Sequence, residues 1–169
     1  LLLDLIRYLQ HWLMHRIGLL WRIHQVHHAD PHYDMTTGLR FHPLEGVLVN
    51  GSYLAAIALL APPVAAVLAV EAAAAVQSLF AHANSDLAAS WERWVRRLWV
   101  TPTLHRVHHS ADPLEQNRNF GMLFPLWDRL FGTYLAASAL PARTMPIGLD
   151  SLPPSQASHF FSLLALPFR

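Results

Sequence analysis

The sequence predicts an all-α protein that is integral to a membrane, with a histidine-rich cap placed over a helical hairpin. Charged residues make up only 14% of the chain against 53% hydrophobic residues, whereas ordinary soluble domains carry about 25% charged residues. Residues 47–83 are almost wholly apolar, as a pair of membrane helices would be. Histidines recur at helical spacing on both sides of that stretch.

The size and composition of the chain restrict what it can be. Its 169 residues suit one domain spanning 1–169. The chain opens on Leu1 inside an apolar run, so we expect it to be part of a longer protein whose first membrane helices are missing. A net charge of +1 and scattered arginines give no electrostatic signature of nucleic-acid binding. The absence of cysteine excludes disulfides and thiolate ligands, so any metal must be held by nitrogen and oxygen.

Residues 1–20 are expected to form a helix with His11 and His15 on one face. Nine residues separate His15 from His24, which is about half a turn out of phase at ~100° per residue. A straight helix would therefore point the two sets in opposite directions. Gly18 is the expected break that brings them together, and the second helix should end near His28, before Ala29-Asp30-Pro31.

Residues 32–43 are expected to form a loop, and residues 47–83 a membrane hairpin that turns at Pro62-Pro63. Arg40 precedes the hairpin and further arginines follow it at 93, 96 and 97, so both ends should lie on the cytoplasmic side. Glu71 would be costly against lipid, so we expect it to face a partner helix in a structural role. The alternative is an Ala-rich helix pair buried in a soluble domain.

The region after the hairpin holds three further expected segments. Residues 90–99 place three tryptophans at helical spacing with arginines on the opposite face, and they are predicted to form an amphipathic helix in the membrane interface, with an ordinary core-facing helix as the alternative. Thr101 and Pro102 should begin the next helix. Residues 110–118 are loop-like and residues 126–133 form a short aromatic segment. The tail, 136–169, carries an apolar segment at 159–168 and no functional signal.

One histidine pattern occurs twice: His24-Gln-Val-His27-His28 recurs as His105-Arg-Val-His108-His109. Positions i, i+3 and i+4 share one helix face, so each copy can aim three imidazoles into one small volume. Without a metal, such rings would repel each other when charged and leave nitrogens unpaired when neutral. We therefore expect the two copies to be the two halves of one dinuclear metal site.

The number of histidines helps to discriminate among metals. Eight or nine clustered imidazoles exceed the four ligands of a structural zinc ion, so two metals fit better. Iron that activates dioxygen suits all-nitrogen ligation, while zinc could occupy the same site without redox chemistry. Neither copy of the pattern contains a carboxylate that could serve as the general base of a metallohydrolase.

Other polar residues are expected to play supporting roles. His32 and His159 are expected to be ordinary core histidines, and His42 to be structural or to support a ligand. Four side chains are candidates to orient imidazoles, and the sequence does not choose among them: Glu45, Asn84, Asp112 and Asp128.

Taken in order, His11-xxx-His15 and the two copies of HxxHH resemble the fatty acid hydroxylase and sterol desaturase superfamily of integral-membrane di-iron oxidoreductases. The connecting segments around residues 4–8, 20–22, 40–45, 80–84 and 126–133 are also similar to that family's pattern. The resemblance covers roughly residues 4–134.

The resemblance implies a catalytic cap on the cytoplasmic side in which two iron ions use O2 and two electrons to hydroxylate or desaturate a lipid. That lipid could be a sterol, a sphingolipid, a fatty acyl lipid or an alkyl lipid. The implied metal-ligating and catalytic residues are nine histidines: His11, His15, His24, His27, His28, His82, His105, His108 and His109.

No flavin, haem or nicotinamide fingerprint is present, so we expect a separate electron donor of the cytochrome b5, ferredoxin or reductase type. Two other functions stay open: a redox-inert zinc-binding membrane module and a metal-dependent lipid hydrolase.

Overall fold

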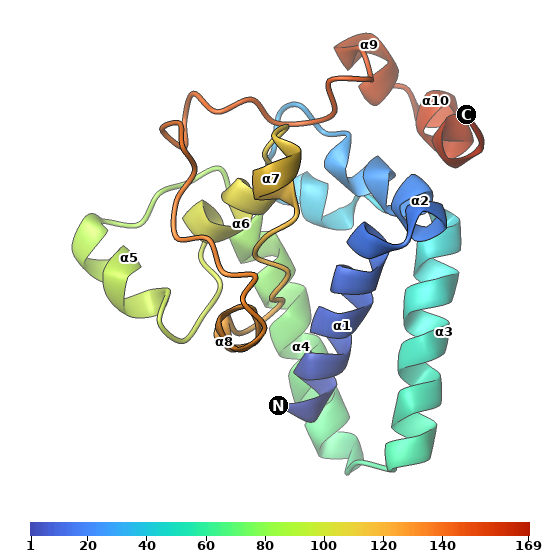
Figure 1. Cartoon of the computed structure of the whole chain (residues 1–169). Helices are drawn as coiled ribbons and strands as arrows, with labels where there is room; N and C mark the ends of the chain where they lie inside the picture. The colour runs from blue at the N-terminus through green and yellow to red at the C-terminus, as the bar shows by residue number, and fades with distance from the viewer.

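A computed structural model describes all 169 residues, and the fold is all-helical, as predicted (Figure 1). Helix α1 lies between the arms of a long hairpin, and the shorter helices gather at the open end of that hairpin. The helices are α1 (Leu2–Arg16), α2 (Gly18–His28), α3 (Pro43–Leu60), α4 (Val64–Ala81), α5 (Ala89–Val95), α6 (Pro102–His108), α7 (Pro113–Gln116), α8 (Leu126–Leu130), α9 (Pro154–Ala157) and α10 (Phe160–Ala165). Two 3-10 helices, η1 (Met35–Leu39) and η2 (Leu166–Phe168), complete the chain.

The first two helices are separated by a sharp break. Ile17 has an extended backbone, with φ −101° and ψ 113°, and α2 begins at the next residue, Gly18. This confirms the bend that the phase of the histidines requires. No atom lies within 4 Å of where a Cβ on Gly18 would stand. Packing therefore does not demand glycine there, and its contribution is poor helix propensity at the break.

The hairpin consists of α3 and α4, joined by a turn at Ala61, Pro62 and Pro63. Ala61 has φ 44° and ψ 47°, and the two prolines prevent the first helix from continuing. Helix α3 begins at Pro43, earlier than the predicted residue 47. The reason is that the His42 Nδ1 accepts the Leu44 N–H at 3.1 Å and caps the helix.

Both arms of the hairpin are long and apolar enough to cross a membrane. Each has 18 residues and is therefore ~27 Å long at 1.5 Å per residue, just under the ~30 Å of a hydrocarbon layer. Only 11% of the α3 span and 17% of the α4 span is buried inside the protein. This exposure disfavours the alternative of a helix pair buried in a soluble core.

Helix α1 is tied to the hairpin by an ion pair. The Arg7 Nη2 lies 2.6 Å from each carboxylate oxygen of Glu71 on α4, and the Arg7 guanidinium stacks 4.1 Å from the ring centre of Tyr53 on α3. Glu71 thus faces a partner helix, as predicted.

The segments beyond the hairpin differ in detail from the prediction. Helix α5 is shorter than the expected 90–99 segment, and Trp91 and Trp94 are 67% and 64% exposed, so the core-facing alternative is wrong. Its place in the membrane interface stays a prediction. Helix α6 begins as predicted, because the Thr101 hydroxyl accepts the Leu104 N–H. The segment 110–118 contains the short helix α7 within its loops.

The C-terminal tail packs back onto the cap. Leu166 joins Val26 and Ala29 in a buried apolar cluster. The His42 Nε2 donates to the Leu164 carbonyl, which fixes His42 in a structural role. The expectation that His32 and His159 are core histidines is wrong, because both side chains are exposed.

Candidate metal centre

The structure brings all nine predicted histidines into two adjacent groups, although they are spread over nearly 100 residues of sequence. Within each group the nitrogens that could bind a metal lie within 4.8 Å of one another. The larger group contains His11, His15, His24, His28 and His108, and the smaller one contains His27, His82, His105 and His109. We call these the five-histidine group and the four-histidine group.

Each HxxHH pattern is divided between the two groups, which corrects the expectation that each pattern forms one half of the site. His24 and His28 join the five-histidine group, while His27 joins the four-histidine group. In α6 the division is reversed, since His105 and His109 belong to the four-histidine group and His108 to the other. The reason is angular: side chains at i and i+4 are ~40° apart on a helix, while i+3 and i+4 diverge by ~100°.

In the four-histidine group, lone pairs face one another. The Nδ1 of His82 donates to the Ser78 carbonyl at 2.7 Å, and the Nδ1 of His27 donates to the Arg40 carbonyl at 3.2 Å. A carbonyl only accepts, so the hydrogen of each neutral ring is on Nδ1 and each Nε2 carries a lone pair. These two Nε2 atoms are 3.2 Å apart. Two lone pairs at that distance need a cation between them.

The other two members complete a ring of four nitrogens. The Nε2 atoms of His105 and His109 lie 3.0 Å and 3.2 Å from the Nε2 of His82. Separations near 3 Å are those expected for ligands of one ion at metal–nitrogen distances of about 2.0–2.1 Å. The Nδ1 atoms of His105 and His109 are buried and have no hydrogen-bond partner.

In the five-histidine group, as in the smaller one, two rings have Nδ1 hydrogen-bonded to a backbone carbonyl and Nε2 without a hydrogen-bond partner. The Nδ1 of His11 donates to the Phe120 carbonyl at 2.9 Å, and the Nδ1 of His108 donates to the Arg118 carbonyl at 2.8 Å. Their Nε2 atoms are buried without a partner, as are both ring nitrogens of His15 and His28. Such orphaned acceptors are costly unless an ion binds them.

One carboxylate touches a predicted ligand. The Nδ1 of His24 donates to the Glu45 Oε1 at 2.6 Å, and both side chains are 4% exposed. A carboxylate behind a metal-binding imidazole fixes the ring and strengthens it as a ligand. The sequence named Glu45 as one of four candidates for this role.

The other three candidates do not contact an imidazole. Asp128 accepts the backbone N–H groups of Phe120 and Gly121, so it shapes the loop whose carbonyl holds His11. Asp112 caps α7, and Asn84 accepts from an arginine. The backbone carbonyls that hold four of the rings could not be found from the sequence, because every residue carries one.

Burial favours the neutral form of eight of the nine imidazoles. Desolvation lowers the pKa of His82 to about 4 and the pKa of His108 to about 3, while carbonyl hydrogen bonds oppose the shift. The pKa values of His11, His15, His27, His28, His105 and His109 also fall well below 6.5, because of burial first and neighbouring imidazoles second. Neutral imidazole is the form that binds a metal, so the groups are ready to bind at neutral pH.

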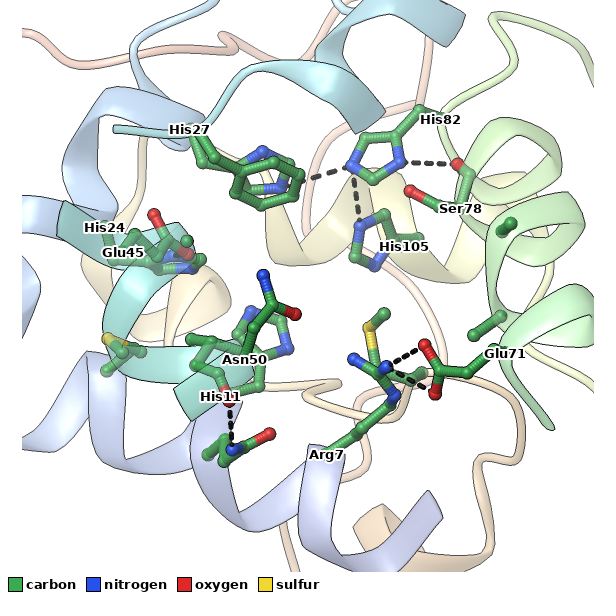
Figure 2. Close-up of a pocket in the computed structure, with 18 residues that line it drawn as sticks. Arg7, His11, His24, His27, Glu45, Asn50, Glu71, Ser78, His82 and His105 are labelled. Atoms are coloured by element: carbon green, nitrogen blue, oxygen red, sulfur yellow. Dashed lines mark hydrogen bonds and ion pairs between the residues drawn. The ribbon is translucent and has the colours of Figure 1, made fainter. Parts of the chain in front are cut away.

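A cavity of about 310 Å³ borders both groups (Figure 2). One face each of α1, α3 and α4 forms its walls, and five of the nine histidines line it. Figure 2 shows the Arg7–Glu71 pair below His82 and His105, with Asn50 among the side chains in the middle of the view. A molecule held in this cavity would touch both groups at once.

Comparisons with known proteins agree with this geometry. The family model described as fatty acid hydroxylase matches residues 1–133. Alkylglycerol monooxygenase of Danio rerio is 30% identical over 159 residues, which cover 86% of this chain and 32% of that protein. Ornithine lipid hydroxylase OlsE of Rhizobium tropici is 32% identical over 161 residues, covering 95% of this chain and 46% of that protein.

The human alkylglycerol monooxygenase is 25% identical over 167 residues, covering 90% of this chain and 34% of that protein. The chain therefore spans 32% to 46% of the length of these relatives. No solved structure matches it. The match over residues 1–133 includes all nine clustered histidines, and on that basis the chain belongs to the fatty acid hydroxylase family.

Proposed function

We propose that this chain is the catalytic part of a membrane-bound, O2-dependent lipid hydroxylase or desaturase with a dinuclear iron site. The observation that carries the proposal is one cavity, between apolar helices, whose wall contains histidines from both groups. A lipid that enters between α3 and α4 would reach the two metals without leaving an apolar environment.

The donor set suits two metal ions. The five-histidine group would hold one ion and the four-histidine group the other, and the facing lone pairs of His27 and His82 are the local reason for a cation. Bound iron would supply the capacity to activate O2 and to oxidise a C–H bond. Zinc would fill the same nitrogens without redox chemistry.

The residues of this chain hold the ligands in place and keep water away. Carbonyls of Ser78, Arg40, Phe120 and Arg118 each receive an Nδ1–H, which fixes both the tautomer and the direction of the ring. The Glu45 carboxylate does the same for His24. The small fraction of exposed surface on these rings limits access of water to the reaction.

The substrate class follows from the relatives and the cavity. The names of two relatives specify an alkylglycerol and an ornithine lipid, and both are amphiphiles with long apolar chains. We therefore infer an alkyl or acyl lipid as substrate. The histidine end of the hairpin would face the cytoplasm, by the arginine distribution at residues 40, 93, 96 and 97, and electrons would come from a separate donor protein.

The proposal is tested on the full-length protein in detergent or nanodiscs. We expect two iron ions per chain and a hydroxylated or desaturated lipid that forms only with O2 and a reductant. His108→Ala should abolish product and lower metal content, while His159→Ala, an exposed histidine outside both groups, should change neither.

Two outcomes would favour the other functions. Zinc alone, with no spectroscopic change on adding reductant, would indicate the redox-inert module. Product formed without O2 would indicate a hydrolase.

A further inference from the structure

We infer that Asn50 is a binding group for a neutral hydrogen-bonding function of the substrate, such as a hydroxyl, ether, ester or amide. The inference rests on the proposed function, in that a lipid occupies the cavity. Asn50 would determine which part of the lipid lies beside the histidines. Its role would be to position the substrate, since its side chain forms no hydrogen bond with either histidine group.

Two polar side chains of the two spans have no hydrogen-bond partner: Tyr53, whose hydroxyl is buried away from the cavity, and Asn50, which is exposed and lines the cavity. On α3, the Ser52 hydroxyl donates to the Leu48 carbonyl at 2.7 Å, and the Tyr53 ring packs on Arg7. On α4, Glu71 is ion-paired with Arg7. Asn50 lines the cavity and makes no side-chain hydrogen bond within the protein (Figure 2). A polar group in a membrane span without a partner is costly, so one that persists there calls for a ligand or water.

Asn50 lines the same cavity as five of the clustered histidines. Glu45, which holds His24, is five residues earlier on the same helix, so the two lie ~7–8 Å apart along the axis and ~140° apart around it. Both line the cavity. In Figure 2 the Asn50 amide points toward the side of the cavity where His27 and His105 lie. A group bound to this amide would hold the neighbouring carbons of the lipid next to the histidines.

The charge balance of the cavity favours a neutral group. Arg7 is 12% exposed and its charge is matched by Glu71 on the same wall. A charged headgroup placed at Asn50 would find no free counter-charge there, and the low dielectric of the site would make its desolvation expensive. An amide carries two donors and one acceptor with two lone pairs, so it can bind a hydroxyl, an ether oxygen or a carbonyl.

The remaining walls suit the apolar part of such a molecule. Met14 of α1, Val49 of α3 and Ala74 of α4 line the cavity between its polar positions. The volume of about 310 Å³ lies at the lower end of ordinary ligand sites, which suits one alkyl chain with a small polar group and excludes a bulky head.

The test measures binding and needs no turnover. Hexadecan-1-ol and heptadecane have equal numbers of non-hydrogen atoms and differ by one hydroxyl. Their affinities are measured in one detergent for the metal-loaded wild type, for Asn50→Leu and for Tyr53→Phe. Partition into micelles is the same for every variant, so the ratio of alcohol to alkane affinity isolates the contribution of the protein. Tyr53→Phe is the matched control, because it removes a hydroxyl three residues away that does not line the cavity.

We expect Asn50→Leu to lower the alcohol-to-alkane affinity ratio by about two- to tenfold, the value of one neutral hydrogen bond, and Tyr53→Phe to leave it unchanged. Asn50→Gln should restore part of the ratio. A wild-type ratio retained in Asn50→Leu would overturn the inference, as would an equal fall in both variants. Failure of the proposed oxidation would appear separately, as missing iron or missing product, while this ratio could still be measured.

Discussion

Removal of the Glu45 carboxylate should weaken one metal and spare the other. Glu45 contacts only His24, which belongs to the five-histidine group, and the 2.6 Å bond is buried. Loss of such a supporting partner typically costs 10- to 100-fold in metal affinity, or about 1.4–2.7 kcal/mol. The loss of metal affinity should be about tenfold for Glu45→Gln, which keeps a neutral acceptor. It should be about 100-fold for Glu45→Ala, which leaves the Nδ1–H of His24 unpaired.

The assay is a competition between the protein and a chelator of known affinity, with metal content measured at each chelator concentration. The wild type should lose its two ions in overlapping steps, while Glu45→Ala should lose one ion at about 100-fold less chelator and retain the other. Glu115→Gln is the control, since that buried carboxylate binds Ser138 and Ala139 and touches no histidine. Equal weakening of both ions, or no weakening of either, would refute the division of the histidines into two groups.

Three further predictions follow from the same geometry. In the metal-free protein, the pKa values of His82 and His108 are lower in the folded state than in the unfolded chain. Below about pH 6.5 the unfolded chain therefore binds more protons than the folded protein, so the free energy of unfolding should be constant above that pH and fall below it. At pH 5 the loss should be about 2 kcal/mol per histidine, measured by denaturant titration at pH 7 and pH 5. Arg7→Met should destabilise the protein by about 1–3 kcal/mol, because the charge of Glu71 is left unpaired, and the Arg7→Met/Glu71→Gln double variant should regain most of that in a thermal melt. A Cβ on Gly38 would lie 3.0 Å from the Nδ1 of His82 and 2.8 Å from a serine hydroxyl of α4, so Gly38→Ala should selectively weaken the ion of the four-histidine group in the chelator assay.

The sequence predicted most of the histidines that cluster in the structure, because their signal is local. A spacing of i, i+3 and i+4 is a property of one helix, and hydropathy alone marks the hairpin. The bend near Gly18 followed from the phase difference between His15 and His24, and the extended Ile17 agrees with it. Each of these inferences needed only neighbouring residues.

The features that the sequence missed depend on how distant helices approach one another. The angular spacing on each helix divides the HxxHH pattern, but which group each part joins depends on how α2 and α6 approach each other, and local spacing does not encode that. The choice of Glu45 from four candidates required the start of α3 to lie beside α2. The exposure of His32 and His159 likewise depends on what the fold leaves uncovered.

Bound metals would link the helices of the cap to one another and to the end of the hairpin. The five-histidine group joins α1, α2 and α6, while the four-histidine group joins α2, α6 and the end of α4. The apolar cluster that joins α2 to the tail has three buried members, Val26, Ala29 and Leu166, with Leu149, Leu152 and Leu163 packed against it. Because imidazole nitrogens of α2 and α6 are buried without a hydrogen-bond partner, the folding of the cap should depend on metal binding.

Removal of the metals should therefore loosen the cap selectively. In hydrogen exchange followed by mass spectrometry, chelation should raise the exchange of α2 and α6 by an order of magnitude or more, while α3 and α4 keep their protection. The reason is that the backbone hydrogen bonds of the hairpin are internal to each helix and lie in an apolar surrounding, where they stay closed without a ligand. Restoring the metal should restore protection in both cap helices together, since α2 and α6 each contribute to both groups. Recovery of one cap helix without the other would contradict the interlaced arrangement.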